Sequence, residues 1–137
     1  MRDIKFRAWD NLSGTMLANR QVSLNIAIDG LVTFNDSSPP FNTYGDVILM
    51  QFTGLIDRHG VEIYEGDIVL QPVGFGMTDD RDLVGEVRML DASWCSVISI
   101  KDGMTFVVYF YEYTKPSEFI VIGNIYEHPD LLDKKGE

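Results

Sequence analysis

The sequence predicts a mostly β protein: a small antiparallel β-barrel (SH3-like or similar) with an N-terminal β-hairpin subdomain and a short C-terminal helical turn. Three observations lead to this prediction. Apolar and polar residues alternate in several short segments, and turn-forming residues separate these segments at fairly regular spacing. The length of 137 residues suits one domain with its own core. A barrel is favoured because closure removes the exposed edges that such apolar strands would otherwise present.

The first strands are expected before residue 45. Side chains alternate in "IKFRA" (4–8), and "DNLSG" (10–14) then predicts a turn. The segment "VSLNIAI" (22–28) has one apolar face that includes Ile28, and "DG" (29–30) follows it directly. Asp-Gly between apolar runs predicts a hairpin, because a type I′ turn needs positive φ at both central positions.

Charge and composition both change near residue 45. The segment "NDSSPPFNTYG" (35–45) predicts an irregular connection, because prolines and clustered Asn, Asp and Ser discourage regular structure. Up to residue 45 the chain has four basic and four acidic residues, whereas the remainder has 7 basic and 17 acidic residues and so carries the whole net charge of −10. We therefore predict an N-terminal hairpin subdomain or arm (1–45), a barrel core (46–132) and a flexible tail (133–137).

The remaining strands follow one another at short intervals. The continuous apolar run "DVILMQFTGL" (46–55) is typical of a strand buried on both faces, although periodicity alone leaves a helix open. "GFGMTDDRD" (74–82) predicts a loop. Further strands are expected in "LVGEVRML", "WCSVISI", "TFVVYFYEY" and "FIVIGNIY", with "DAS" and "KDGM" short enough to be hairpin connections. "EHPDLL" (127–132) predicts a short helical turn with Pro129 near its first position.

The stretch "GLIDRHGVEIYEGDIV" (54–69) combines four acids and a histidine with two turns, so it raises the question of an active site. Each residue also has a structural role available. Asp57 can cap the turn "DRHG" through its side chain, and Gly60 can adopt positive φ there. Gly66 permits the sharp bend that a barrel corner requires, and Asp67 can accept backbone N–H groups beside it. The stretch is therefore interpreted mainly as architecture.

Three segments carry a family resemblance. "MQFTGLIDRHGVEIYEGDIV" (50–69), the opening "MRDIKFRAWD" and the closing "VIGNIYEHPDLL" (121–132) together resemble the YopX family, small proteins encoded by tailed bacteriophages and prophages. The resemblance touches both ends and the middle of the chain. It implies a phage or prophage origin and a mostly β fold with a compact barrel. It implies no catalytic residues, because no activity is established for the family. The linking segments, notably "SSPPFNTYG" and "GFGMTDDRD", depart from the family pattern.

The residues that could carry catalysis or bind a metal all have a simpler interpretation. His59 and His128 lack the paired spacing of a transition-metal site, and "DDRD" (79–82) lacks the alternating ligands of a calcium loop. Cys95 is expected to be a half-buried strand residue. Grouped carboxylates at Glu62, Glu65 and Asp67 leave paired-carboxylate chemistry open, but turn-building is favoured. We therefore predict a protein that is not an enzyme, with no cofactor and no metal.

Partner binding is the favoured function. "TFVVYFYEY" places Tyr109, Tyr111 and Tyr113 on one side of a strand, where they could belong to the core, to a protein interface or to a base-stacking surface. An acidic loop with Asp79, Asp80 and Asp82 would suit a basic partner. The predicted partner is an unknown host or phage protein, with a homo-oligomer as an alternative. Nucleic acid is less favoured, because Arg2, Lys5 and Arg7 form a weak basic footprint on an acidic chain.

The expected compartment is the cytoplasm of a bacterial host. A single cysteine excludes a disulfide within the chain and fits a reducing environment. The polar N-terminus does not resemble a signal peptide, and no apolar run approaches the roughly 20 residues that a membrane helix needs.

Overall fold

The computed structural model describes residues 4–17, 22–26, 28–29, 32–36, 43–44, 47–71, 83–99, 105–110 and 118–133. Two compact units make up the chain: an N-terminal unit, Lys5–Gln51, and a barrel unit that combines Met1–Ile4 with Phe52–Glu137. Their division falls inside one strand, β6 (Val47–Ile56), whose first half belongs to the N-terminal unit. The domain boundaries drawn from the sequence stay a prediction.

The N-terminal unit is built from antiparallel strands. Its elements are β1 (Phe6–Asp10), β2 (Thr15–Met16), β3 (Val22–Ile26), β4 (Val32–Asp36), β5 (Thr43–Tyr44) and the first half of β6. Strand β1 pairs with β2 on one side and with β6 on the other. The turn predicted at residues 10–14 is confirmed: the buried Asp10 carboxylate accepts the Leu12 N–H at 3.0 Å and the Ser13 hydroxyl at 2.6 Å, and Gly14 has a φ of 65°.

The predicted β3–β4 hairpin is confirmed, with one correction. The last described pair is Ile26–Val32, and residues 28–29 lie in the turn of the connection between the two strands. Ile28 lies in this connection with a fully exposed side chain and does not extend the apolar face. In the segment 35–45, the described residues lie in strands and not in an irregular connection, because β4 continues to Asp36 and β5 (Thr43–Tyr44) pairs with it; residues 37–42 and 45 lie outside the described residues. The added β-ladder bonds outweigh the poor local propensity of this segment.

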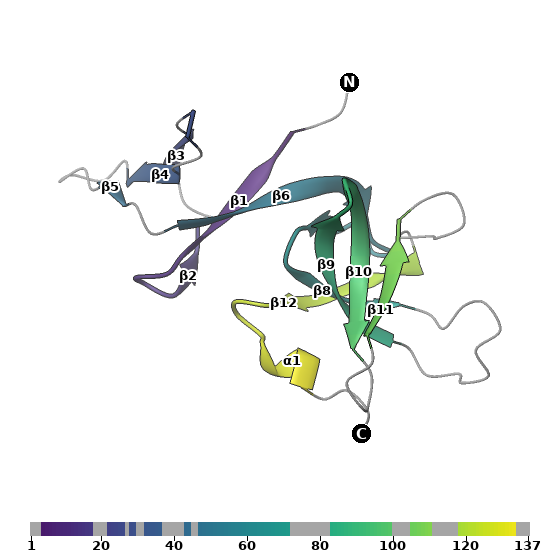
Figure 1. Cartoon of the computed structure of the whole chain (residues 1–137). Coiled ribbons are helices and arrows are strands. Elements are labelled where there is room, and N and C mark those ends of the chain that lie inside the picture. The colour runs from purple at the N-terminus through teal and green to yellow at the C-terminus, as the bar shows by residue number, and fades with distance from the viewer. Residues whose placement is uncertain are drawn as a thin grey trace, which may run out of the picture. The chain divides into compact units, whose positions relative to one another are not determined.

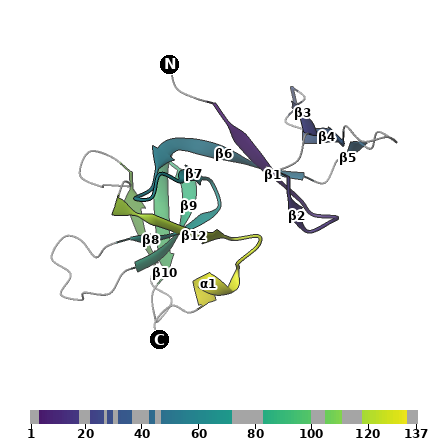
Figure 2. The ribbon, with the colours of Figure 1, turned by 180° about the vertical axis from the view of Figure 1, so that it is seen from behind.

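The barrel unit contains the second half of β6 and the rest of the described strands, which the ribbon views show from both sides (Figures 1 and 2). These are β7 (Glu62–Tyr64), β8 (Asp67–Gln71), β9 (Leu83–Leu90), β10 (Ser93–Ser99), β11 (Thr105–Tyr109) and β12 (Ile120–Asn124). Five of them form a curled antiparallel sheet in the order β11-β10-β9-β8-β12, and β6 pairs with β7. The mostly β, barrel-like fold predicted from the sequence is therefore confirmed.

The core of the barrel unit lies on the concave side of this sheet. Ile63, Val69, Val87 and Phe119 form its buried cluster. Trp94 and Phe110 pack against them, and the Phe110 and Phe119 rings meet edge to face at 5.5 Å. Burying side chains of this size is worth about 1.5–3 kcal/mol each relative to exposure. The apolar side chains that β7, β8, β9 and β10 direct toward the core thus stabilise the barrel unit.

Sharp turns connect the strands at the positions where the sequence allows them. Gly60 and Gly66 have φ values of 80° and 84°, which confirms the two predicted turns in 54–69. Strand β9 passes into β10 through Asp91 and Ala92, which both have positive φ (49° and 61°). The predicted helical turn is confirmed as α1 (Asp130–Asp133), and it follows Pro129 directly.

Strand β11 fits one of the two arrangements that its composition allows. The apolar pattern of "TFVVYFYEY" indicates a strand that is central or that buries one face, and β11 is the last of the described strands in its sheet, followed by Phe110, which packs against the core. The strand ends at Tyr109, and Val107 keeps 40% of its side chain exposed. Local propensity fixes that this segment is a strand, but only its pairing partner fixes its place in the sheet.

Candidate interaction surface on the barrel sheet

The contacts of Asp57, in the stretch 54–69, are structural. Its buried carboxylate accepts the N–H groups of His59 and Val61, both at 2.8 Å, within the turn. The second oxygen accepts the Val121 N–H of β12 at 2.9 Å. Burial by itself would raise the pKa of Asp57, but these three donors outweigh it and hold the pKa below its ordinary value. The carboxylate therefore stays ionised and fastens the turn to β12.

Two other acids of this stretch, Asp67 and Glu62, also make local contacts. Asp67 is fully buried and accepts the Tyr64 N–H at 2.8 Å beside the corner glycine, as predicted. Glu62 accepts the Tyr64 hydroxyl at 2.9 Å. Both contacts join residues within three positions of each other in the chain.

The two histidines lie apart from any set of metal ligands. His59 is exposed on the turn, and the Nδ1 atom of His128 accepts the Asn124 N–H at 3.3 Å. Within the ranges that the structure describes, no three His, Cys, Asp or Glu side chains are grouped so that they could hold a metal ion.

A row of three side chains crosses the convex face of the sheet. Cys95 on β10 is paired with Arg88 on β9 and with Tyr109 on β11. Residues directly opposite each other in antiparallel strands point to the same face. A second row, Glu86–Val97–Val107, lies beside the first. We call the exposed or half-exposed members of these rows, together with Asp91, the β9–β11 surface: Glu86, Arg88, Asp91, Val107 and Tyr109.

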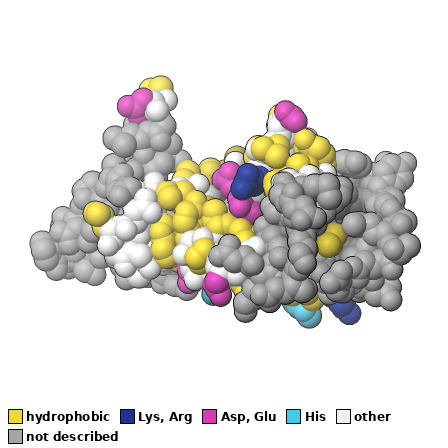
Figure 3. Space-filling view, turned by 60° about the horizontal axis from the view of Figure 1, so that its bottom comes forward, with side chains coloured by type: hydrophobic (Ala, Val, Ile, Leu, Met, Phe, Trp, Pro, Cys, Tyr) yellow, Lys and Arg dark blue, Asp and Glu magenta, His cyan; other side chains and the backbone are white. Residues whose placement is uncertain are grey.

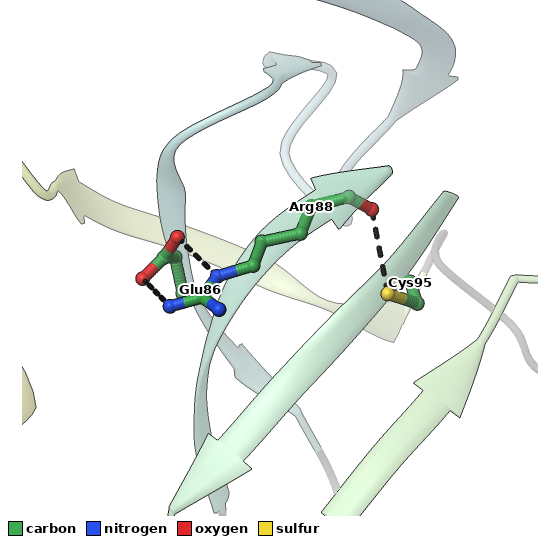
Figure 4. Close-up of polar contacts among 3 residues, drawn as sticks. All are labelled: Glu86, Arg88 and Cys95. Carbon is green, nitrogen blue, oxygen red and sulfur yellow. Dashed lines mark hydrogen bonds and ion pairs between the residues drawn. The ribbon is translucent and has the colours of Figure 1, made fainter. Parts of the chain in front are cut away.

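An ion pair fixes one side of this surface. The Arg88 guanidinium donates to both Glu86 oxygens, at 2.6 and 3.0 Å, as the close-up shows (Figure 4). The hydrogen bond to Glu86 raises the pKa of Arg88 further above its ordinary value. Because the contact is two-pronged, the planar guanidinium is held in one orientation over the sheet.

Cys95 lies beneath these side chains. It is fully buried, not half-buried as the sequence indicated, and its thiol donates to the Arg88 carbonyl at 3.4 Å (Figure 4). Burial raises the pKa of the Cys95 thiol. A buried, protonated thiol is a poor nucleophile, so its contacts are those of a packing residue.

A second polar contact lies at the other side of the surface. The Tyr109 hydroxyl donates to the Asp91 carboxylate at 3.0 Å, joining β11 to the β9–β10 turn. This hydrogen bond raises the pKa of Tyr109. Val107 is 40% exposed on this surface. The space-filling view shows that apolar side chains, interrupted by charged ones, reach one face of the molecule (Figure 3).

The structure places only part of the predicted partner-binding set. Tyr109 lies on the β9–β11 surface, whereas Tyr111, Tyr113, Asp79, Asp80 and Asp82 lie outside the described residues. Sequence analysis did not single out Glu86, Arg88 or Asp91. Their alternation on β9 was visible, but the cross-strand register that groups them with Tyr109 was not.

The structure also describes only part of the basic set proposed for nucleic-acid binding. Arg2 lies outside the described residues, Lys5 is exposed, and Arg7 is half-buried on β1. Among the helices that the structure describes, none has the length and apolar character needed to cross a membrane.

The fold and this surface define a class: small, antiparallel β-barrel-like proteins with a partly polar, partly aromatic sheet face. Comparison with known proteins identifies the family. The model of the YopX protein family matches residues 5–133, so the chain belongs to the YopX family.

Two solved structures agree with this assignment. Protein EF1440 from Enterococcus faecalis is 25% identical with a TM-score of 0.58, and protein yopX from Bacillus subtilis is 24% identical with a TM-score of 0.60. Each comparison covers 96% of this chain and 99% of the other. None of the curated proteins compared with the chain matches it.

Proposed function

We propose that this YopX protein is a non-enzymatic binding module, encoded by a phage or prophage, that recognises a host or phage protein in the bacterial cytoplasm. The observation that carries the proposal is the β9–β11 surface. There, an exposed valine and a tyrosine lie beside a two-pronged Arg–Glu pair on a rigid sheet. Tyr and Arg are enriched at protein interfaces, where they give large contacts at low entropic cost.

Charge supports a basic partner. The barrel unit holds eight Lys and Arg against seventeen Asp and Glu, a net charge of −9, which leaves −1 for the N-terminal unit. A field of this sign attracts a basic protein during diffusional encounter and repels phosphate backbones. The acidic loop with Asp79, Asp80 and Asp82 contributes three of these charges.

The non-enzymatic part of the proposal rests on the hydrogen bonds of the candidate catalytic groups. Asp67 accepts a backbone N–H group, Glu62 accepts the Tyr64 hydroxyl, and Cys95 is buried beneath Arg88. The phage or prophage origin rests on the family resemblance, and the cytoplasmic location on the single, buried thiol.

Affinity capture from bacterial lysate, with and without nuclease, tests the proposal. We expect at least one protein to be retained after nuclease treatment and then to bind the purified chain directly. Reversing Asp79, Asp80 and Asp82 to Lys should slow its association and weaken the salt dependence of the rate. Retention that disappears with nuclease would contradict the proposal and favour the nucleic-acid alternative. Unchanged association after charge reversal would remove the acidic loop from the interface.

A matched pair of substitutions tests the surface itself. Tyr109→Ala removes the aromatic ring, whereas Tyr109→Phe removes only the hydroxyl that Asp91 accepts. If the ring provides contact area, Tyr109→Ala should weaken binding by roughly tenfold or more and Tyr109→Phe by much less. Equal affinity of both variants and the wild type would exclude this face.

A further inference from the structure

The two outer strands of the barrel sheet differ in how their edges are protected. An edge strand presents unpaired N–H and C=O groups, and soluble proteins usually protect such edges with bulges, charges, prolines or covering segments. In the order β11-β10-β9-β8-β12, the outer strands are β11 and β12. Figures 1 and 2 show that β12 runs across the sheet and that its start lies close to the end of β11, where the Phe110 and Phe119 rings meet.

The β12 edge has several of these protections. A bulge interrupts its ladder between Val121 and Gly123. The Asp57 carboxylate accepts the Val121 N–H, and the Phe119 carbonyl, just before the strand, accepts the Arg58 N–H at 2.8 Å. The β6–β7 turn therefore covers the outer side of β12.

The β11 edge has none of these features within the described residues. Its sequence, "TFVVY", contains no charge, no proline and no glycine, and its five pairs with β10 run without a shift. Phe110 donates its N–H to Trp94 at 2.9 Å, and hydrogen-bonded positions alternate along an antiparallel pair. The N–H and C=O groups of Thr105 and Val107 are therefore turned away from β10, toward the outer edge.

The side chains at this edge are suited to contact. Thr105 is exposed, and Val107 is 40% exposed, one strand away from the Glu86–Arg88 pair, with Val97 of β10 between them. A short, β-branched edge without a bulge is a template for one more strand. The net charge of −9 on the barrel unit indicates which charge the side chains of the added strand should have. A second copy brings the same negative charge, whereas a strand with Lys or Arg complements it.

We propose that β11 is a docking edge at which a basic protein partner adds an extended strand, alternating apolar side chains with Lys or Arg, to the barrel sheet. This inference rests on the proposed protein-binding function and specifies its mode. The backbone groups of Thr105 and Val107 bond the added strand. Its apolar side chains lie against Val107, and its basic side chains face the acidic surroundings.

Selection from a random displayed peptide library, using the full chain as bait, provides the probe. The enriched peptides are then measured against three variants. Val107→Pro removes an outward N–H, a position where an edge strand tolerates proline. Val107→Lys keeps the N–H but places a positive charge on the edge. Val61→Lys is the matched control, because Val61 is 47% exposed and lies on the β6–β7 turn, which contacts β12 and not the Thr105–Val107 part of the edge.

We expect the enriched peptides to be extended and rich in alternating apolar and basic residues. Their affinity should fall roughly tenfold or more with Val107→Pro and Val107→Lys, and stay unchanged with Val61→Lys. The Thr105 and Val107 amides should become protected from hydrogen exchange when the peptide binds. Circular dichroism and thermal melting establish that each variant is folded; if Val107→Pro is not, Val107→Lys and the exchange data decide.

Three outcomes would overturn the docking edge. These are an absence of enriched peptides, enriched peptides that bind all variants equally, and acidic or helical ligands. Sedimentation of the wild-type chain as a dimer that Val107→Pro dissociates would assign the edge to a second copy instead. A nuclease-resistant protein partner whose binding ignores both Val107 variants would leave the proposed function standing and exclude this mode alone.

Discussion

Asp57 accepts the backbone N–H of Val121 at 2.9 Å, a side-chain contact between residues 64 positions apart in the chain. The same carboxylate accepts two N–H groups within its own turn. One acid thus shapes the β6–β7 turn and fastens it to the start of β12. The stretch 54–69, whose acids and histidine raised the question of an active site, therefore contributes hydrogen bonds that stabilise the fold.

Replacing Asp57 by Asn should destabilise the barrel unit by about 1–3 kcal/mol at neutral pH, because an amide cannot supply the same two acceptor oxygens. The native pKa of Asp57 lies below its ordinary value of 3.8. Its contribution is therefore fully present above pH 3.8 and is lost as the pH falls through the lowered native value. Denaturant unfolding across this range should show a flatter acid limb for Asp57→Asn. The exposed Asp130→Asn is the control, and an unchanged acid limb in Asp57→Asn would contradict the assignment.

Gly123→Ala should loosen the C-terminal turn. A Cβ atom at residue 123 would lie 2.7 Å from His128 Nδ1 and 2.9 Å from Leu131 Cδ1, so α1 would have to shift. We expect a loss of about 1–3 kcal/mol and faster hydrogen exchange of the Leu131 and Leu132 amides. Gly123→Ala should therefore cost less free energy of unfolding when it is made in the His128→Ala variant than when it is made in the wild type. If the two losses simply add, His128 is not what a Cβ would meet.

Ala92→Gly should stabilise the β9–β10 hairpin. Ala92 has a φ of 61°, a region in which an L side chain costs roughly 1–2 kcal/mol and glycine costs little. A gain of about 0.5–1 kcal/mol in the free energy of unfolding is expected, since part of the relief is offset by the freer unfolded chain. Ala8→Gly, at a buried strand position on β1, should instead destabilise the protein. A destabilised Ala92→Gly would argue against the positive φ.

Ser96→Ala should destabilise the barrel unit, because it removes one partner of a buried hydrogen bond. The Ser96 hydroxyl donates to Gln71 Oε1 at 2.7 Å, and both residues are buried. Removing the donor leaves the Gln71 amide unsatisfied, at a cost of about 1–3 kcal/mol. Ser96→Ala/Gln71→Leu, which removes both partners, should be more stable than the single Ser96→Ala variant. Thermal unfolding of the four proteins in this cycle measures the coupling, and a coupling near zero would mean that the pair is not formed.

Cys95 should react slowly with thiol reagents while the chain is folded. Burial keeps the thiol protonated by raising its pKa and also blocks access of the reagent. Alkylation should become fast only in denaturant. Rapid modification of the native protein at neutral pH would contradict the burial of Cys95 and reopen nucleophilic chemistry.

Features that depend on near neighbours could be predicted from the sequence. Gly60, Gly66 and the capping role of Asp57 follow from turn chemistry within a few residues, and the span of β9 follows from alternation. The Val121 partner of Asp57 could not be predicted in the same way, because nothing local in the sequence brings residues so far apart together.

The β9–β11 surface was only partly predictable for the same reason. Tyr109 was visible as part of a tyrosine pattern, but its neighbours across the sheet depend on register. Ile28 shows the opposite error: its apolar character fitted the strand pattern, yet the strand ends at Ile26 and Ile28 lies exposed in the connection. Periodicity identifies strands, whereas their ends and their order in the sheet depend on the pairing of distant segments.

Strand β6 is shared by the two compact units, since residues Val47–Gln51 pair with β1 and Phe52 pairs with Tyr64 of β7. The point of division therefore lies within a ladder and not in a linker. If the gene recombines with a relative at this point, the encoded β6 has one half from each parent. Both units can then fold only if the two halves keep the same register. Recombination is thus expected to carry the two units as a single cassette.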